Sequence, residues 1–99
     1  MLETNRLFSQ GQQAFQEKNY ERAIDYYQQF IEQSEIIPAL VYYHLGVSFK
    51  NQGQMKQAIF SFAQLIETDP KNATGYYQIG CLFLEEGFVA EALMYLQKT

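Results

Sequence analysis

Residues 39–72 read ALVYYHLGVSFKNQGQMKQAIFSFAQLIETDPKN, and this stretch contains two helical patterns separated by a turn. In each half, apolar or small residues recur at spacings of three and four, as they do along one face of an α-helix. They are Tyr42, Leu45, Gly46 and Phe49, followed by Met55, Ala58, Ile59, Phe62 and Ile66. Gly53 suits the left-handed residue that closes a helix, and Pro70 disfavours helical backbone at the residue before it. The stretch therefore predicts a helix–turn–helix unit.

The same unit recurs on both sides of this stretch. Glycines stand at positions 11, 46 and 80, which are 35 and 34 residues apart. An alanine follows each glycine after 12 residues, and a bulky apolar residue follows each alanine after four. The alanines are Ala23, Ala58 and Ala92, and the bulky residues are Tyr27, Phe62 and Leu96. Three columns in phase over three copies indicate a repeat protein.

The repeated glycine has a physical explanation. A glycine inside a helix costs about 1 kcal/mol relative to alanine, so its recurrence suggests close backbone approach by a neighbouring helix. The alanine would be the matching small residue on the second helix of the unit, and the bulky residue would fill the space beside the contact. We predict helices over residues 4–16, 20–34, 38–51, 54–67, 73–86 and 88–98.

These columns resemble the tetratricopeptide repeat, whose pattern is W-x2-L-G-x2-Y…A-x3-F…P. Copy two fits it with Tyr42, Leu45-Gly46, Phe49, Ala58, Phe62 and Pro70, and copy three fits with Tyr76, Ile79-Gly80, Phe83, Ala92 and Leu96. Copy one keeps Leu7, Gly11, Ala14, Ala23 and Tyr27 but has no proline in phase. The resemblance implies one all-α domain over 1–99, a right-handed α-solenoid of three hairpins and six antiparallel helices. The repeats would be about 4–37, 39–72 and 73–99. Phe30 and Leu65 stand where the family favours a small residue, which predicts shifted packing.

Composition excludes several other classes. The 99 residues are 47% hydrophobic, which does not fit a disordered chain. A net charge of −4 argues against a nucleic-acid partner. No apolar run is long enough for membrane insertion, and the first residues do not form a secretory signal. A single cysteine, Cys81, permits no intrachain disulfide. We expect a cytoplasmic protein.

The resemblance implies that the first helix of each unit lines a concave surface. Helical phase selects three residues on each such helix, spaced i, i+4 and i+7. They are Phe8, Gln12 and Phe15, then Tyr43, Val47 and Lys50, then Tyr77, Cys81 and Leu84. The set is mostly apolar or aromatic, so we expect a groove that binds a peptide segment of a partner protein. Single tyrosines in these columns could instead pack on the second helix.

The alternative function is self-association. The last predicted helix carries Val89, Ala92, Leu93 and Leu96 toward its own hairpin partner by helical phase, leaving Met94 and Tyr95 directed elsewhere. Met94 and Tyr95 would then lie toward a following repeat, or toward a second copy in a weak homodimer.

Catalysis and cofactor binding are not indicated. His44 and Cys81 lack a third group that would orient them for nucleophilic chemistry, and no Cys/His spacing predicts a metal site. Some relatives hold a peptide's terminal carboxylate with lysine, arginine and asparagine. The corresponding residues here are Phe8, Gln12, His44, Thr74 and Gln78. None of them is lysine, arginine or asparagine, so that carboxylate clamp is not expected.

Overall fold

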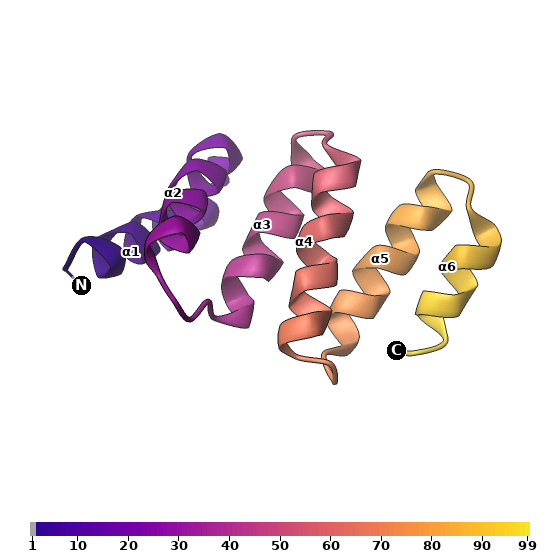
Figure 1. Ribbon diagram of the computed structural model, residues 1–99. Helices are drawn as coiled ribbons and strands as arrows, with labels where there is room; N and C mark the ends of the chain where they lie inside the picture. Colours follow the sequence, from indigo (N-terminus) through magenta and orange to yellow (C-terminus); the bar gives the residue numbers. More distant parts are fainter. Residues whose placement is uncertain (1) are drawn as a thin grey trace.

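The computed structural model describes residues 2–99 and shows six helices joined by short turns (Figure 1). The helices are α1 (Leu2–Gln16), α2 (Tyr20–Gln33), α3 (Ala39–Asn51), α4 (Met55–Thr68), α5 (Ala73–Glu85) and α6 (Val89–Leu96). These residues contain no strand. The predicted helices are confirmed, with ends that differ by at most two residues, and Met1 of the predicted domain lies outside the described residues.

The helix ends follow from local chemistry. Asn19 and Asn72 accept hydrogen bonds through their side chains from the backbone N–H groups of Arg22 and Gly75, and so cap the starts of α2 and α5. Gly53 and Gly87 close α3 and α5 with positive φ angles of 76° and 85°. Lys18 takes the same left-handed place after α1, at φ 60°, and is the non-glycine residue that adopts it.

Each hairpin is closed by its glycine lying against its bulky residue. A Cβ added to Gly46 would lie 2.5 Å from the ring of Phe62, and one added to Gly11 would lie 2.6 Å from the ring of Tyr27. At Gly80 the side chain of Leu96 would lie at 2.7 Å. Close packing at each glycine is therefore present in all three hairpins, but the predicted backbone approach is corrected: at Gly11 and Gly46 the neighbour is an aromatic side chain, and only at Gly80 does a backbone atom, the oxygen of Ala92 at 3.3 Å, also lie near. The nearest atoms to each glycine belong to the bulky residue, because removal of Cβ makes room for that side chain.

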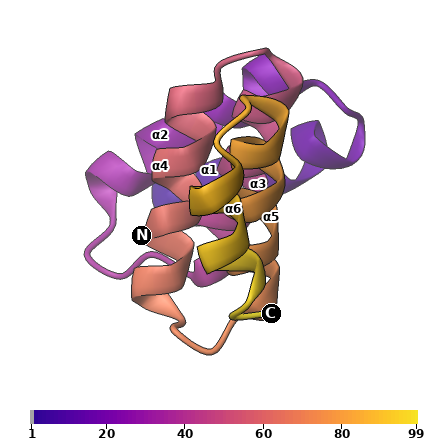
Figure 2. The same ribbon diagram turned by 90° about the vertical axis from the view of Figure 1, so that its right-hand side faces the viewer.

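The hairpins stack in chain order to form an elongated body of 45 × 25 × 19 Å. α2 packs on α3 and α4 packs on α5, so each hairpin contacts the next through its second helix. In the second and third hairpins, the second helices α4 and α6 lie to the left of the first helices α3 and α5 (Figure 2). The buried core runs through all three hairpins, from Leu7 to Leu82.

The unusual Phe30 packs within the first hairpin. It is buried, and its ring lies 5.3 Å from that of Phe8 between centroids. The bulk at this column is therefore accommodated by aromatic packing on α1.

Two further features are absent from residues 2–99. None of the helices combines the length and the apolar character needed to cross a membrane. No cluster of three or more histidine, cysteine or acidic side chains is arranged to hold a metal ion within this range.

Candidate functional site: the α1–α3–α5 face

The nine residues expected in the groove are on α1, α3 and α5, which form one layer of the stack. Tyr77 and Leu84 on α5 are the most exposed large side chains among them, at 52% and 45%. The remaining seven are half-buried: Phe8, Gln12, Phe15, Tyr43, Val47, Lys50 and Cys81. Among the nine predicted residues, the most exposed therefore lie on α5.

Aromatic residues of α1 and α3 also contribute to the packing between helices. The ring of Phe8 lies edge-on to that of Tyr27, with centroids 6.3 Å apart. Tyr43 lies 6.2 Å from Phe62, measured in the same way. Each of these side chains therefore presents only part of its surface to a ligand, and truncating it would also disturb the hairpin behind it.

Phe15 and His44 join the first two hairpins. Their rings stack with centroids 3.8 Å apart and an interplanar angle of 12°. The hydroxyl oxygen of Tyr27 and Nδ1 of His44 lie 2.7 Å apart and share a hydrogen bond. Burial lowers the pKa of His44 and raises the pKa of Tyr27 well above its usual range, so both side chains are neutral near pH 7. This arrangement places Phe15 and His44 in the joint between hairpins.

On α5, Tyr77 and Cys81 are one helical turn apart. A hydrogen bond with Cys81 raises the pKa of the Tyr77 phenol. The phenol is neutral near pH 7, as an ordinary tyrosine is, and offers an aromatic face and a hydrogen-bonding hydroxyl. These properties suit recognition of an uncharged segment.

A hollow of about 300 Å³ lies beside Tyr43, between the first turns of α3 and α5. It is lined by Ala39, Leu40, Tyr43, Leu65, Asn72 and Thr74. Leu40, which is exposed, is not among the predicted groove residues, and Thr74 appears only as a position of the carboxylate clamp. Leu40 precedes Tyr43 by three residues, and Thr74 precedes Tyr77 by three. Extending the predicted trios by one turn would have found both residues.

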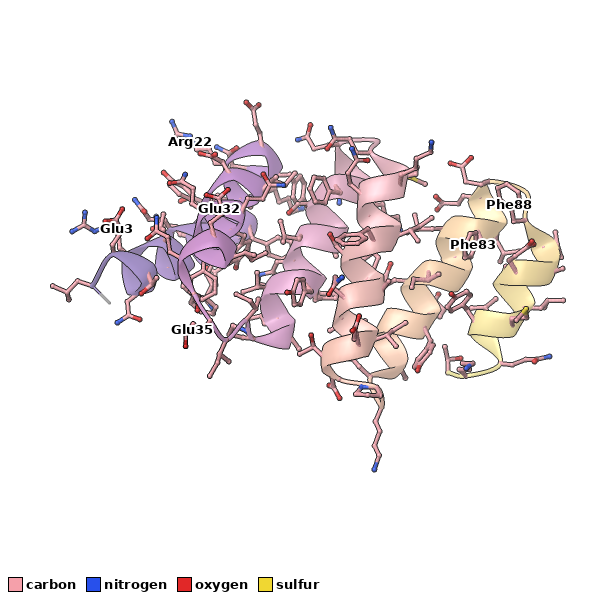
Figure 3. All side chains as sticks on the ribbon, in the orientation of Figure 1. Glu3, Arg22, Glu32, Glu35, Phe83 and Phe88 are labelled. Atoms are coloured by element: carbon pink, nitrogen blue, oxygen red, sulfur yellow. The ribbon has the colours of Figure 1, made fainter. Side chains whose placement is uncertain are left out.

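The last hairpin corrects one expectation. Tyr95 is half-buried, and its ring lies 5.6 Å from that of Phe83 on α5. Val89 and Leu93, which were expected to face α5, are 55% and 52% exposed. Figure 3 shows Phe83 beside Phe88 in this hairpin, where the two rings meet edge-on at 6.1 Å.

The preceding hairpin gives the physical reason for this correction. Residues 34 positions before Val89 and Leu93 are Met55 and Ile59, and both are half-buried. Ile59 lines a hollow together with Phe83 of the following hairpin. This side of a second helix is thus covered by the next hairpin in the stack. No helix within residues 2–99 covers it on α6, so Val89 and Leu93 are exposed while Tyr95 packs inward.

Comparison with known proteins agrees with the geometry of the hairpins. The family model of the tetratricopeptide repeat matches residues 7–34 and 40–72. The chain therefore belongs to the tetratricopeptide repeat family. Its third hairpin keeps the same contact between glycine and bulky residue, although the matched residues end before it.

Similar proteins are mostly longer than this chain. The "Probable serine/threonine-protein kinase BSK3" of Oryza sativa subsp. japonica is 28% identical over 92 residues, which are 93% of this chain and 19% of that protein. A crystal structure of MamA superposes with a TM-score of 0.88 at 26% identity, over 96% of this chain and 55% of MamA. The chain thus spans about a fifth of the kinase and about half of MamA.

Two further structures share this fold at lower sequence identity. PcrH, solved in complex with the chaperone binding region of PopB, gives a TM-score of 0.84 at 17% identity and covers 96% of this chain and 76% of its own. The second tetratricopeptide domain of Spaghetti (RPAP3), bound to the HSP90 peptide SRMEEVD, gives 0.83 at 21% identity and covers 97% and 88%.

Proposed function

We propose that this protein is a non-catalytic interaction module whose α1–α3–α5 face binds a peptide segment of a partner protein. The observation that carries the proposal is the run of exposed or half-exposed apolar side chains along this face, from Leu40 and Tyr43 to Tyr77 and Leu84. Tetratricopeptide proteins of the same fold have been solved with peptide segments bound, as PcrH and RPAP3 illustrate. Aromatic and aliphatic anchors are the side chains that dominate such interfaces.

The chemistry of the face favours an apolar segment over an acidic terminus. The positions that would form a carboxylate clamp hold Phe8, Gln12, His44, Thr74 and Gln78, and His44 is neutral and bonded to Tyr27. Lys50 is the cation among the nine predicted residues. Binding should accordingly depend only weakly on salt.

The test uses a peptide selected on the intact protein from a random library and measured by isothermal titration calorimetry. Tyr77→Ala should weaken binding by about 2 kcal/mol, as expected for a good aromatic anchor, and Leu84→Ala should weaken it as well. Phe60→Ala is the matched control, since Phe60 is an exposed aromatic residue on α4 in the opposite layer. Equal affinity in Tyr77→Ala and wild type, or a loss confined to Phe60→Ala, would contradict this assignment.

A second candidate function, self-association, is supported by the uncovered side of α6. Val89 and Leu93 occupy the positions that the next hairpin covers in the preceding repeat, so a second copy could cover them in a twofold dimer. Val89→Lys combined with Leu93→Lys should abolish concentration-dependent association in light scattering, whereas Met94→Lys should have a smaller effect. A wild-type protein that stays monomeric at every concentration would exclude this candidate.

A further inference from the structure

A second cleft lies on the opposite layer of the stack, away from the proposed peptide face. It has a volume of about 320 Å³ and opens between α2 and α4, with α3 as its floor. Its lining residues are Gln28, Ile31, Tyr42, Leu45, Phe49, Lys56, Gln57, Phe60, Ser61 and Gln64. A volume of this size lies at the lower end of the range for small-molecule sites.

Comparison of two hairpins explains why the cleft exists. In the third hairpin, the ring of Tyr95 on α6 covers Phe83 on α5, with centroids 5.6 Å apart. The residues 34 positions earlier are Ser61 and Phe49, and both line the cleft. Serine is too small to reach across as tyrosine does. The cleft is therefore the space that an aromatic ring fills in the neighbouring repeat.

Charge around the cleft favours an anion. Lys56 is the charged residue among the lining side chains, although the whole chain carries a net charge of −4. Lys56 and Gln57 belong to the first turn of α4, which contains no acidic residue and whose cap residue, Gln54, makes no side-chain hydrogen bond to it. Uncapped backbone N–H groups and the helix dipole both stabilise negative charge at such an end.

The surroundings favour a small molecule over a protein surface. On α2 and α4, one large hydrophobic side chain is exposed: Phe60, with 64% of its surface accessible. The other exposed residues of these two helices are small or polar, such as Asp25, Ala63 and Glu67. A stable protein interface needs roughly 800 Å² per partner with an apolar centre, whereas here the apolar surface is confined to the cleft.

We propose that the α2–α4 cleft binds a small molecule with one aromatic ring and a carboxylate. The ring would pack on Phe49 and beside Phe60, as Tyr95 packs on Phe83. The carboxylate would face Lys56 and the first turn of α4. This site is separate from the proposed peptide face and does not depend on it.

The test compares two probes that share the phenol ring of Tyr95. N-acetyl-tyrosine carries a carboxylate, and N-acetyl-tyrosinamide is its neutral counterpart. Each is titrated into the ¹⁵N-labelled full chain, and amide shifts are followed by NMR. The acid should give saturable shifts in the first turns of α4 and around Ile31 and Tyr42. The neutral probe should bind about two- to fivefold more weakly, the usual effect of one exposed charge pair.

Three variants test which residues hold the probe. Lys56→Gln should reduce the advantage of the acid over the neutral probe, whereas Lys71→Gln, the same charge change outside the cleft, should leave both affinities unchanged. Ser61→Tyr should fill the cleft as Tyr95 does in the third hairpin and abolish the shifts, with helicity and melting temperature retained as a check on folding.

Several outcomes would overturn the proposal. They are shifts centred on Tyr43 and Tyr77, shifts that do not saturate, and undiminished binding in a folded Ser61→Tyr variant. Equal binding of the two probes would also overturn it, and would point to an uncharged aromatic side chain of a partner protein as the occupant.

Discussion

Replacing Gly46 by alanine tests the packing on which every hairpin depends. The added Cβ would lie 2.5, 2.6 and 2.7 Å from three atoms of the Phe62 ring. That ring is completely buried, so it cannot turn toward solvent. Overpacking a core typically costs about 1–3 kcal/mol, and three simultaneous contacts place this site in the upper half of that range. Alanine regains about 1 kcal/mol of helix propensity.

The expected net loss for Gly46→Ala is therefore about 1–2 kcal/mol in the free energy of unfolding. In a chain of this length, that corresponds to a fall of at least roughly 4 °C in melting temperature. Circular dichroism during urea and thermal unfolding measures both quantities.

Gly80→Ala is the matched control, because it makes the same change at the same place in the third hairpin. Its Cβ would meet Cδ2 and Cγ of Leu96 at 2.7 Å and, less closely, the backbone oxygen of Ala92 at 3.3 Å. Leu96 is flexible and half-buried, so it can move aside. We expect Gly80→Ala to be more stable than Gly46→Ala by about 1 kcal/mol or more, since the propensity gain of about 1 kcal/mol is the same in both.

A double-mutant cycle with Phe62→Leu isolates the contact. Leucine at 62 reproduces the third hairpin, so Gly46→Ala should cost less in that background than in wild type. The reasoning fails if Gly46→Ala is as stable as wild type, or if its cost is the same with leucine at 62.

Three further outcomes follow from buried groups. Ala58→Leu should lower the free energy of unfolding by about 1–3 kcal/mol, since Ala58 has no exposed surface, whereas Ala63→Leu on the exposed side of α4 should change it little. Equal urea midpoints of the two variants would contradict this prediction. Ser48→Ala should raise the free energy of unfolding by about 1 kcal/mol more than Ser9→Ala does, because the buried Ser48 hydroxyl has no hydrogen-bond partner and Ser9 is exposed. An equal gain in the two variants would show that burying the Ser48 hydroxyl does not destabilise the fold. Burial lowers the pKa of His44, so as pH falls the unfolded chain protonates this imidazole before the folded chain does, and stability falls as pH drops below about 6.5. Thermal melts across that range should show a smaller fall in the melting temperature for His44→Gln than for wild type. An identical fall would show that another group causes the pH dependence.

The sequence alone determined the helices and their pairing within each hairpin. Those features depend on residues close in the chain: helical spacing around Gly46, the left-handed Gly53, and the alanine and bulky residue that follow. All nine residues expected on the α1–α3–α5 face were selected by phase along single helices. Whether they bind a peptide stays a prediction.

Tertiary structure decided how each helix is covered by its neighbours. Helical phase could not show that Tyr95 packs on Phe83 while Val89 and Leu93 stay exposed. The side of a second helix that carries these residues is covered by a different hairpin, the next one in the stack. It also could not show that Phe15 and His44 stack, since their contact depends on how the first two hairpins are placed.

The α2–α4 cleft shows the same limit most clearly. Ser61 reads as an ordinary polar residue in the sequence of α4, and Phe49 reads as a core position. Only when α2, α3 and α4 are placed together does the small side chain leave a cleft beside Phe49, which is itself largely buried. Periodicity records which side of a helix is buried, but the space left between helices depends on the volumes of side chains that come from different hairpins.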